Sequence, residues 1–229
     1  KVKTTYTPHI VGVTPTAEPA KSVDVQGATQ ESTVTFNGGT TTLDGKQVTV
    51  DIDPATFTLL DETGTPATSV PAKDPSGNVI GTYTLKTVGG QAVAVFTPTD
   101  KTYSGEVQPV RVQAKDKNGI SVETTYTPLI TPVTPTAEPA ETTDIQGKEQ
   151  TGKPEFKPGN PDVPMDDDTP ATFEDGSKEK VVPGEGTYTV APDGTVTFTP
   201  EKNFTGKGTG VTVKRVDKNG TPVTAKYTP

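Results

Sequence analysis

The sequence predicts an all-β protein built as two tandem small β-sandwich repeats that are joined end to end by a Pro-rich linker. Val and Thr are abundant, and β-branched side chains favour strands over helices. The 23 Gly and 23 Pro residues divide the chain into short segments, within which apolar and polar residues alternate. Long strings of residues also occur twice at a regular distance, which indicates a tandem repeat.

Length and composition favour two lean domains over a disordered chain. The 229 residues suffice for two domains of ordinary size. Hydrophobic residues make up 29% of the chain, so the cores are expected to be small. Disorder requires low hydrophobicity together with a high charge, and a formal net charge of -8 is mild for this length.

The same composition argues against disulfides in the cores and against nucleic acid or a membrane as a partner. The chain has no cysteine, so no disulfide can crosslink the cores. Its pI near 4.8 and the lack of a basic cluster argue against nucleic acid or an anionic membrane. No apolar run approaches the roughly 18 residues of a membrane span, and the N-terminus lacks an apolar signal core. We therefore expect a soluble piece, with any targeting or anchoring signal outside it.

The internal repeat is the strongest signal in the sequence. The string VTPTAEPA occupies residues 13–20 and again residues 133–140, an offset of 120 residues. The offset falls along the chain, to 101 residues at the string DKNG, which begins at Asp116 and at Asp217. The first repeat is therefore 19 residues longer than the second, with 11 of these residues between Phe57 and Gly81.

Aromatic residues support this alignment, because a true repeat reuses its core positions. Every aromatic residue of the first repeat has an aromatic counterpart in the second. The predicted core residues are Phe36, Phe57, Tyr83, Phe96, Tyr103 and Tyr126 in the first repeat, and Phe156, Phe173, Tyr188, Phe198, Phe204 and Tyr227 in the second.

Two segments read as β-hairpins. Residues 186–200 place Tyr188 and Val190 on one face, turn at a Pro-Asp-Gly sequence, and return with Val196 and Phe198 on the same face. Residues 110–126 alternate in the same way around an Asn-Gly turn. Several such strands at regular spacing predict a small β-sandwich in each repeat.

The alignment also predicts the domain boundaries. Tyr6 lies in a TTYTP string that recurs at residues 124–128, so residues 1–8 are predicted to be the last-strand remnant of a preceding repeat. The first repeat then spans residues 9–128, with an insertion near 58–80, and the second spans residues 129–229. The connection carries Pro128, Pro132, Pro135 and Pro139. Closely spaced prolines favour extended polyproline II, which predicts a semi-rigid interdomain linker.

Three segments together resemble a known family: VTPTAEPA, residues 184–200 (GEGTYTVAPDGTVTFTP) and residues 211–229 (VTVKRVDKNGTPVTAKYTP). They are similar to the CshA-type fibril repeat of streptococcal, Gram-positive, cell-wall-anchored surface adhesins. The match is close over residues 133–229, whereas residues 9–128 depart from the pattern. The resemblance implies tandem repeats that build a surface fibril, anchored covalently to peptidoglycan, with adhesion to fibronectin carried by a separate N-terminal region.

Candidate catalytic residues are scarce. His9 is the only histidine and lies in a Pro-flanked segment, so it is expected to be solvated and cannot complete a Ser-His-Asp or Cys-His arrangement. Paired carboxylates need a substrate cleft, which repeats of this size seldom supply. We therefore predict no enzyme and no cofactor.

Two other site chemistries remain open as minor alternatives. Carboxylates at residues 166–168, or Asp51 with Asp53, could bind Ca²⁺, although an acidic run is more often a solvated loop. A covalent bond between a Lys and an Asn or Asp would suit a cysteine-free surface fibril. Asn118 and Asn219, however, fall in predicted turns rather than in an apolar core. The prediction is therefore no metal site and no crosslink.

The predicted function is a structural stalk. The repeats are expected to be monomeric, to contact neighbouring repeats in the same chain, and to project an N-terminal adhesive region from the cell wall. A host glycoprotein such as fibronectin, or partner bacteria, would bind the intact adhesin outside these repeats. The alternative is a repeat-borne binding module for such a partner, located in the longer first repeat because an inserted loop is a common place for recognition.

Overall fold

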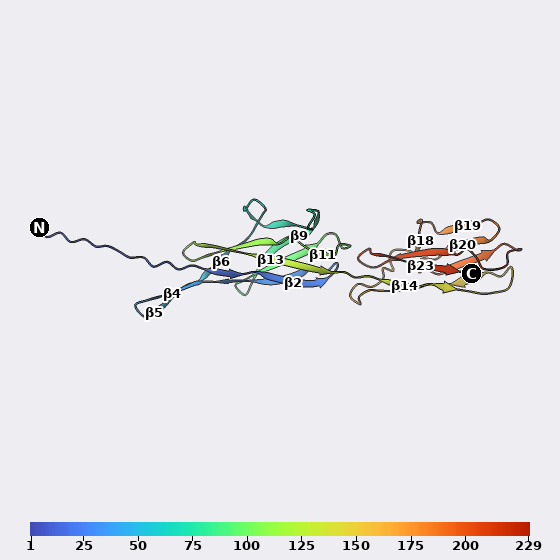
Figure 1. The fold of residues 1–229 in the computed structure, drawn as a ribbon, viewed down its shortest axis with the longest axis horizontal. Coiled ribbons are helices and arrows are strands. Elements are labelled where there is room, and N and C mark those ends of the chain that lie inside the picture. The colour runs from blue at the N-terminus through green and yellow to red at the C-terminus, as the bar shows by residue number, and fades with distance from the viewer. The chain divides into compact units, whose positions relative to one another are not determined.

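A computed structural model describes all residues from Lys1 to Pro229 and is all-β, as predicted. The chain divides into two compact units, Lys1–Thr131 and Pro132–Pro229, each of which is described by itself (Figure 1). Residues 1–15 form no strand. No helix that is long and apolar enough to cross a membrane occurs.

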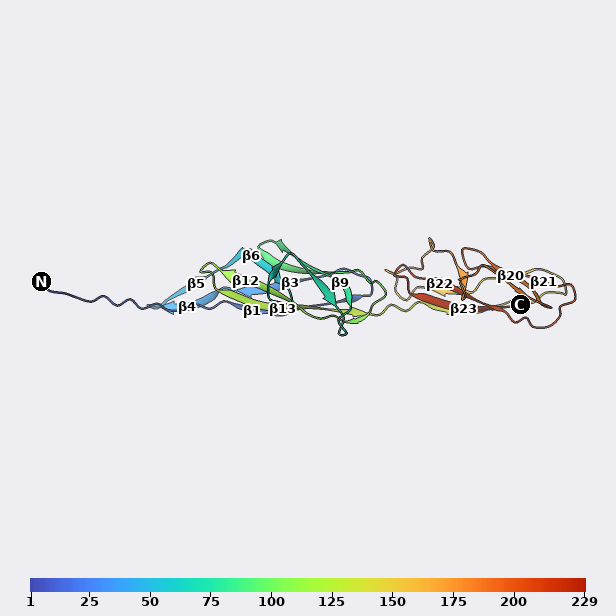
Figure 2. The same cartoon turned by 90° about the horizontal axis from the view of Figure 1, so that it is seen from above.

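The first unit is a sandwich of two sheets (Figure 2). One sheet has the order β1-β3-β10-β9-β8, with strands Thr16–Glu18, Gln30–Asn37, Gln91–Pro98, Val79–Val88 and Ser69–Lys73. The other has the order β11-β13-β12-β6-β7, with strands Gly105–Glu106, Ser121–Thr131, Val110–Asp116, Ile52–Leu60 and Pro66–Ala67, and β2 (Ala20–Val25) also pairs with β13. Buried residues of both sheets share one core, which includes Tyr83, Phe96, Val112 and Tyr126.

The second unit repeats this plan with shorter strands. One sheet has the order β16-β21-β20-β19, with strands Gln150–Gly152, Val196–Pro200, Gly186–Val190 and Glu179–Val182. The other has the order β15-β23-β22-β18, with strands Ala140–Glu141, Pro222–Thr228, Val211–Val216 and Thr172–Phe173. A small pair, β14 (Thr136–Glu138) with β17 (Glu155–Lys157), matches β1 with β3. Its core includes Tyr188, Phe198 and Tyr227.

Both predicted hairpins are confirmed. Strands β20 and β21 are antiparallel, and Tyr188 lies opposite Phe198 while Val190 lies opposite Val196. All four side chains are buried, which the alternation of apolar and polar residues predicts. In the first unit β12 and β13 pair in the same way, with Val110 opposite Tyr126.

The extra length of the first unit forms two features. The insertion near residues 58–80 adds β7, which has no equivalent in the second unit, whereas β8 forms the same sheet edge that β19 forms there. A second addition forms a separate two-stranded hairpin, β4 (Gly39–Leu43) with β5 (Lys46–Val50). Leu43 and Val48 on this hairpin are exposed.

The predicted linker differs from the structure, because most of it belongs to the folded units. Pro128 is buried within β13, and Leu129–Thr131 complete that strand, although the predicted boundary places those three residues in the second repeat. Pro139 lies between β14 and β15. Only residues 132–135 lie outside strands between β13 and β14.

Even this short segment is packed against the second unit. Val133 is 3% exposed and Pro135 is buried, whereas Pro132 is exposed. A Cβ on Gly159 would lie 2.3 Å from the Thr134 carbonyl oxygen, so only glycine permits this close approach. Proline spacing alone predicts an extended backbone, but it does not distinguish a free spacer from a docked one.

Candidate functional site

The second strand and the last strand of each unit lie side by side and run parallel. In the first unit β2 pairs with β13 over six residue pairs, from Ala20 with Tyr126 to Val25 with Thr131. In the second unit β15 pairs with β23 over two, Ala140 with Tyr227 and Glu141 with Thr228. Because the two strands point the same way, the chain enters each unit at one end and leaves it at the other.

A cluster of hydroxyl and amide groups joins these strands in the first unit. The Ser22 hydroxyl donates to Gln30 Oε1 at 2.6 Å and lies 2.7 Å from the Tyr126 hydroxyl. Gln30 Nε2 donates to the Leu129 carbonyl oxygen at 3.0 Å. Burial raises the pKa of Tyr126, and the hydrogen bond with Ser22 offsets part of this rise. The phenol is therefore neutral at physiological pH.

The second unit repeats the cluster at equivalent positions. The Thr142 hydroxyl donates to Gln150 Oε1 at 2.5 Å and lies 2.7 Å from the Tyr227 hydroxyl. Burial likewise raises the pKa of Tyr227. The recurrence of a hydroxyl, an amide and a phenol in both units shows that this clamp, formed by Ser22, Gln30 and Tyr126 or by Thr142, Gln150 and Tyr227, is part of the repeat itself.

Sequence reasoning placed the two tyrosines in the core but missed their partners. A signal was present, because the offset of 120 residues aligns Gln30 with Gln150 and Ser22 with Thr142. The aligned position alone does not tell that these polar side chains are buried beside a tyrosine of the last strand, so the repeat predicts the pairing of positions but not the hydrogen bonds. A comparison of polar residues at the same offset would have found these positions.

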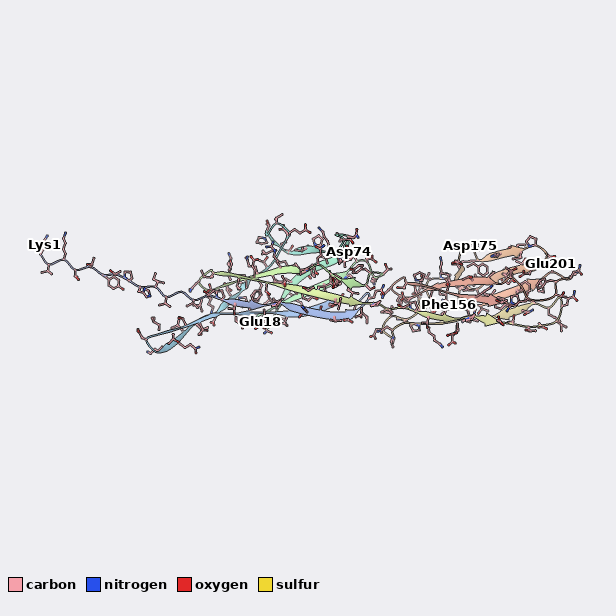
Figure 3. All side chains as sticks on the ribbon, viewed as in Figure 1. Lys1, Glu18, Asp74, Phe156, Asp175 and Glu201 are labelled. Carbon is pink, nitrogen blue, oxygen red and sulfur yellow. The ribbon has the colours of Figure 1, made fainter.

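The predicted core aromatics divide into two groups. Tyr83, Phe96, Tyr126, Phe173, Tyr188, Phe198 and Tyr227 are buried. The others are partly buried and pack against the two cores: Phe36, Phe57, Tyr103, Phe156 and Phe204. Phe156, labelled in Figure 3, is one of these flanking residues of the second unit.

The acidic run of the second unit is engaged by cations of its own chain. Lys218 Nζ lies 2.5 Å from an Asp166 carboxylate oxygen and 2.7 Å from one of Asp168, and Arg215 lies 2.7 Å from Asp167. Hydrogen bonds from Lys218 and Thr169 lower the pKa of Asp166 to about 2. No group of three or more potential metal ligands occurs in the structure.

Most other shifted aspartates stabilise turns. Asp74 and Asp175, labelled in Figure 3, each accept a backbone hydrogen bond from the turn they begin. A hydrogen bond from the side chain of Asn78 or Ser177 lowers the pKa of each. A general acid needs a raised pKa, whereas the pKa of each of these two carboxyls is lowered. They act as Asx-turn residues, which tighten a loop.

Glu185 is the most buried carboxyl with a shifted pKa. Burial alone would raise its pKa, but hydrogen bonds from Thr209 and Tyr188 outweigh this and lower it. The Thr209 backbone N–H and hydroxyl donate to it at 2.8 Å and 2.6 Å. Glu185 therefore serves as a fixed acceptor that ties β20 to the segment before β22.

Comparison with known proteins gives a family and several structural likenesses. The family model described as the surface adhesin CshA repetitive domain matches residues 12–130 and again residues 132–229. The NMR structure of repeat domain 13 of the fibrillar adhesin CshA from Streptococcus gordonii is 70% identical. That alignment covers 31% of this chain and 90% of that chain, with a TM-score of 0.19. No curated protein matches.

Two distant structures also match over most of the chain. The crystal structure of titin domains Z1Z2 in complex with telethonin is 15% identical, with 95% of this chain and 97% of that chain covered and a TM-score of 0.46. A tetra-tandem repeat from the extending region of a large adhesion protein is 17% identical, with 95% and 49% covered and a TM-score of 0.28. With the family match covering both units, the chain belongs to the CshA repeat family of surface adhesins.

Proposed function

We propose that the two repeats are stalk units of a cell-surface fibrillar adhesin and project an N-terminal adhesive region away from the cell wall. Membership of an adhesin repeat family places the protein at the extracellular surface. The parallel pairing of β2 with β13 and of β15 with β23 supports the stalk role most directly. A unit that the chain enters at one end and leaves at the other adds its length to a series of such units.

Other parts of the proposal follow from the same role. The repeats bind their neighbours in the same chain, remain monomeric and catalyse no reaction. A peptidoglycan anchor and an adhesive region that binds a host glycoprotein such as fibronectin, or a partner bacterium, belong to the rest of the adhesin.

One observation favours the alternative of a binding module in the first repeat. The β4–β5 hairpin pairs only with itself and exposes Leu43 and Val48. A two-stranded hairpin alone is marginally stable in water, so a partner covering it would be favourable. Binding of immobilised fibronectin by this chain, lost when residues 40–49 are replaced by a short Gly-Ser turn, would support the alternative over the stalk.

Small-angle scattering of the chain tests the stalk proposal. A compact body of 229 residues would have a radius of gyration of about 17 Å. Stalk units in series are expected to exceed this value by at least half, because each repeat contributes its own length. A radius of gyration near the compact value would contradict the proposal.

A matched pair of variants serves as the control. Pro132 is exposed in the connection, so Pro132→Gly is expected to loosen the connection and reduce the average radius of gyration. Pro183 is exposed in a turn inside the second unit, and Pro183→Gly is expected to leave the scattering unchanged. Equal profiles for both variants would argue that the connection does not set the spacing.

A further inference from the structure

The two repeats fill the same corner of the core with different side chains. The residue before the Gly-Thr-Tyr-Thr string is Ile80 in the first unit and Glu185 in the second. Their positions are equivalent, because the carbonyl oxygen of Ile80 accepts from the Thr99 N–H and that of Glu185 from the Glu201 N–H, each at 2.9 Å. Ile80 is 3% exposed and Glu185 is 6% exposed. A carboxyl group therefore occupies a buried position that the other repeat fills with an aliphatic side chain.

A second difference makes room for this carboxyl group. Val107 is 3% exposed in the first unit, and at the offset of 101 residues its counterpart in the second unit is Gly208. A Cβ on Gly208 would lie 2.7 Å from the Tyr188 hydroxyl oxygen and 2.9 Å from Glu185 Oε1. A larger residue at this position would therefore displace one of these polar groups. The aliphatic pair Ile80 and Val107 is thus replaced, as a pair, by Glu185 and Gly208.

The carboxylate accepts three hydrogen bonds from two segments of the chain. The Thr209 backbone N–H donates to Glu185 Oε1 at 2.8 Å, and the Thr209 hydroxyl donates to Oε2 at 2.6 Å. The Tyr188 hydroxyl also donates to Oε1. In the first unit the equivalent Tyr83 hydroxyl donates to the Gln108 carbonyl oxygen at 2.6 Å instead. The second repeat therefore attaches the segment before β22 to β20 through a carboxylate, where the first repeat uses apolar packing.

Other titratable side chains approach this corner from several elements. Burial raises the pKa of Tyr188 and of Tyr227, so both phenols stay neutral in acid. Lys207 pairs with Glu141 at 3.0 Å, and no cation forms an ion pair with Glu185. Hydrogen bonds, rather than a cation, therefore stabilise the charged form of Glu185. The surrounding titratable groups are Tyr188 on β20, Tyr227 and Lys226 on β23, the exposed Glu201 after β21, and Lys207 beside Gly208.

We propose that Glu185 and Gly208 form an acid-sensitive contact in the second repeat. The charged carboxylate holds the segment before β22 on β20 at neutral pH, and protonation of the carboxylate releases that segment. A protonated carboxyl group carries a donor of its own, whereas the site presents three donors to it, so the hydrogen bonds can no longer all be satisfied. The first repeat lacks such a contact, because Ile80 and Val107 do not titrate. This inference goes beyond the stalk proposal and does not depend on it.

The hydrogen bonds determine the direction of the pH dependence. Burial raises the pKa of Glu185, but the hydrogen bonds from Thr209 and Tyr188 outweigh it and leave the pKa below its usual value of 4.5. The unfolded chain therefore binds this proton at a higher pH than the folded repeat does. The stabilisation by Glu185 is complete above about pH 4.5 and is lost as the pH falls through the lowered value of the folded repeat.

The test compares the full chain with its Glu185→Gln variant by nuclear magnetic resonance, in which separate signals report each repeat. The Gln side chain is uncharged at every pH and presents an N–H group to the same donors, so it mimics the protonated carboxyl group. At pH 6 the variant is expected to lower the melting temperature of the second repeat by about 4–8 °C and to leave that of the first unchanged. Between pH 6 and pH 3 the melting temperature of the second repeat is expected to fall further in the parent than in the variant.

A matched control uses a carboxyl group at the surface of the same repeat. Glu179 is exposed on β19, so Glu179→Gln is expected to behave as the parent at both pH values. Turn aspartates with lowered pKa values, such as Asp74 and Asp175, occur in both repeats. Only the difference between the parent and Glu185→Gln is therefore assigned to Glu185. An equal fall in melting temperature for these two chains would overturn the proposal.

The backbone amide signal of Thr209 reports the contact directly. In the parent this signal is expected to shift as the pH falls below about 4.5, because its acceptor is protonated. A Thr209 signal that does not move between pH 6 and pH 3 would overturn the proposal. Because this measurement uses the parent chain, it remains decisive where a variant fails to fold.

A double variant transfers the apolar pair of the first repeat to the second. With Glu185→Ile and Gly208→Val together, the Tyr188 hydroxyl can donate to the Thr209 carbonyl oxygen, as its counterpart does in the first repeat. This chain is expected to fold at pH 6, whereas Gly208→Val alone is expected to lower the melting temperature because the added side chain meets the carboxylate. Its second repeat is expected to lose less melting temperature at pH 3 than that of the parent. An equal loss in the double variant and the parent would overturn the proposal.

Discussion

A chain with Phe198→Ala is expected to lose the second repeat and retain the first. Phe198 is fully buried, and its ring lies 4.6 Å from the ring of Tyr188 and 5.9 Å from that of Phe204, measured between centroids. Removing a buried Phe side chain costs about 3–5 kcal/mol, because contacts are lost and a cavity remains. A repeat with a small core and no disulfides has a small free energy of unfolding, so this loss is expected to unfold it.

Phe96→Ala in the first repeat is the matched variant. Phe96 is also fully buried, packs on Tyr83 and is the counterpart of Phe198. Nuclear magnetic resonance spectra of the two variants are expected to lose complementary sets of dispersed signals. Loss of both repeats in either variant would show that the two cores are not independent.

Pulling on the two ends of the chain is expected to unfold the second repeat at a lower force than the first. Tension along the chain loads the parallel pairs β2–β13 and β15–β23 in shear, so their hydrogen bonds must break together. The first unit has six residue pairs in this patch and the second has two. At about 1 kcal/mol for each hydrogen bond, the longer patch gives a substantially higher barrier.

Single-molecule force spectroscopy can assign each event, because the longer first unit releases more chain when it unfolds. Ser22→Ala, which removes the hydroxyl between Gln30 and Tyr126, is expected to lower the unfolding force of the first repeat and to leave that of the second unchanged. Thr33→Ala, at an exposed position on β3, is the control and is expected to change neither force. A first repeat that yields at the same force as the second would show that the patch does not set mechanical strength.

Much of the fold could be predicted from the sequence because the signals are local. The strand pair around residues 186–200 follows from alternation and turn chemistry alone. The aromatic alignment identified core positions, because a repeated fold buries the same sites. Sequence separation limited the rest: Ala20 and Tyr126 are neighbours in space, and no local pattern pairs a first strand with a last one.

The linker shows where a local rule fails. The sequence predicts that Pro128 belongs to a spacer, because closely spaced prolines favour extended polyproline II. In the structure β12 pairs with β13 up to Tyr126 and β11 pairs from Leu129, so Pro128 falls between these two partners. No neighbouring strand on that edge needs a hydrogen bond from the backbone nitrogen of residue 128, so the missing N–H of the proline costs nothing there. Tertiary context therefore accommodates a proline that the sequence alone marks as a break.

The clamp residues were missed for a different physical reason. Ser22 is a small polar residue on β2 and Thr142 one that directly follows β15, and such residues are usually solvated. Their importance comes from hydrogen bonds to Tyr126 and Tyr227, which are more than 80 residues away along the chain. Only the conserved spacing between the two repeats carries this information.

Measuring the height of the N-terminus above a surface tests the stalk proposal most directly. Chains with two, four and eight repeats, each a concatenation of residues 12–229, would be attached through the C-terminus and labelled with a fluorophore at the N-terminus. The proposal predicts that the mean height of the fluorophore rises in proportion to the number of repeats. A height that stays constant as repeats are added would contradict it, because such repeats could not hold an adhesive region away from the cell.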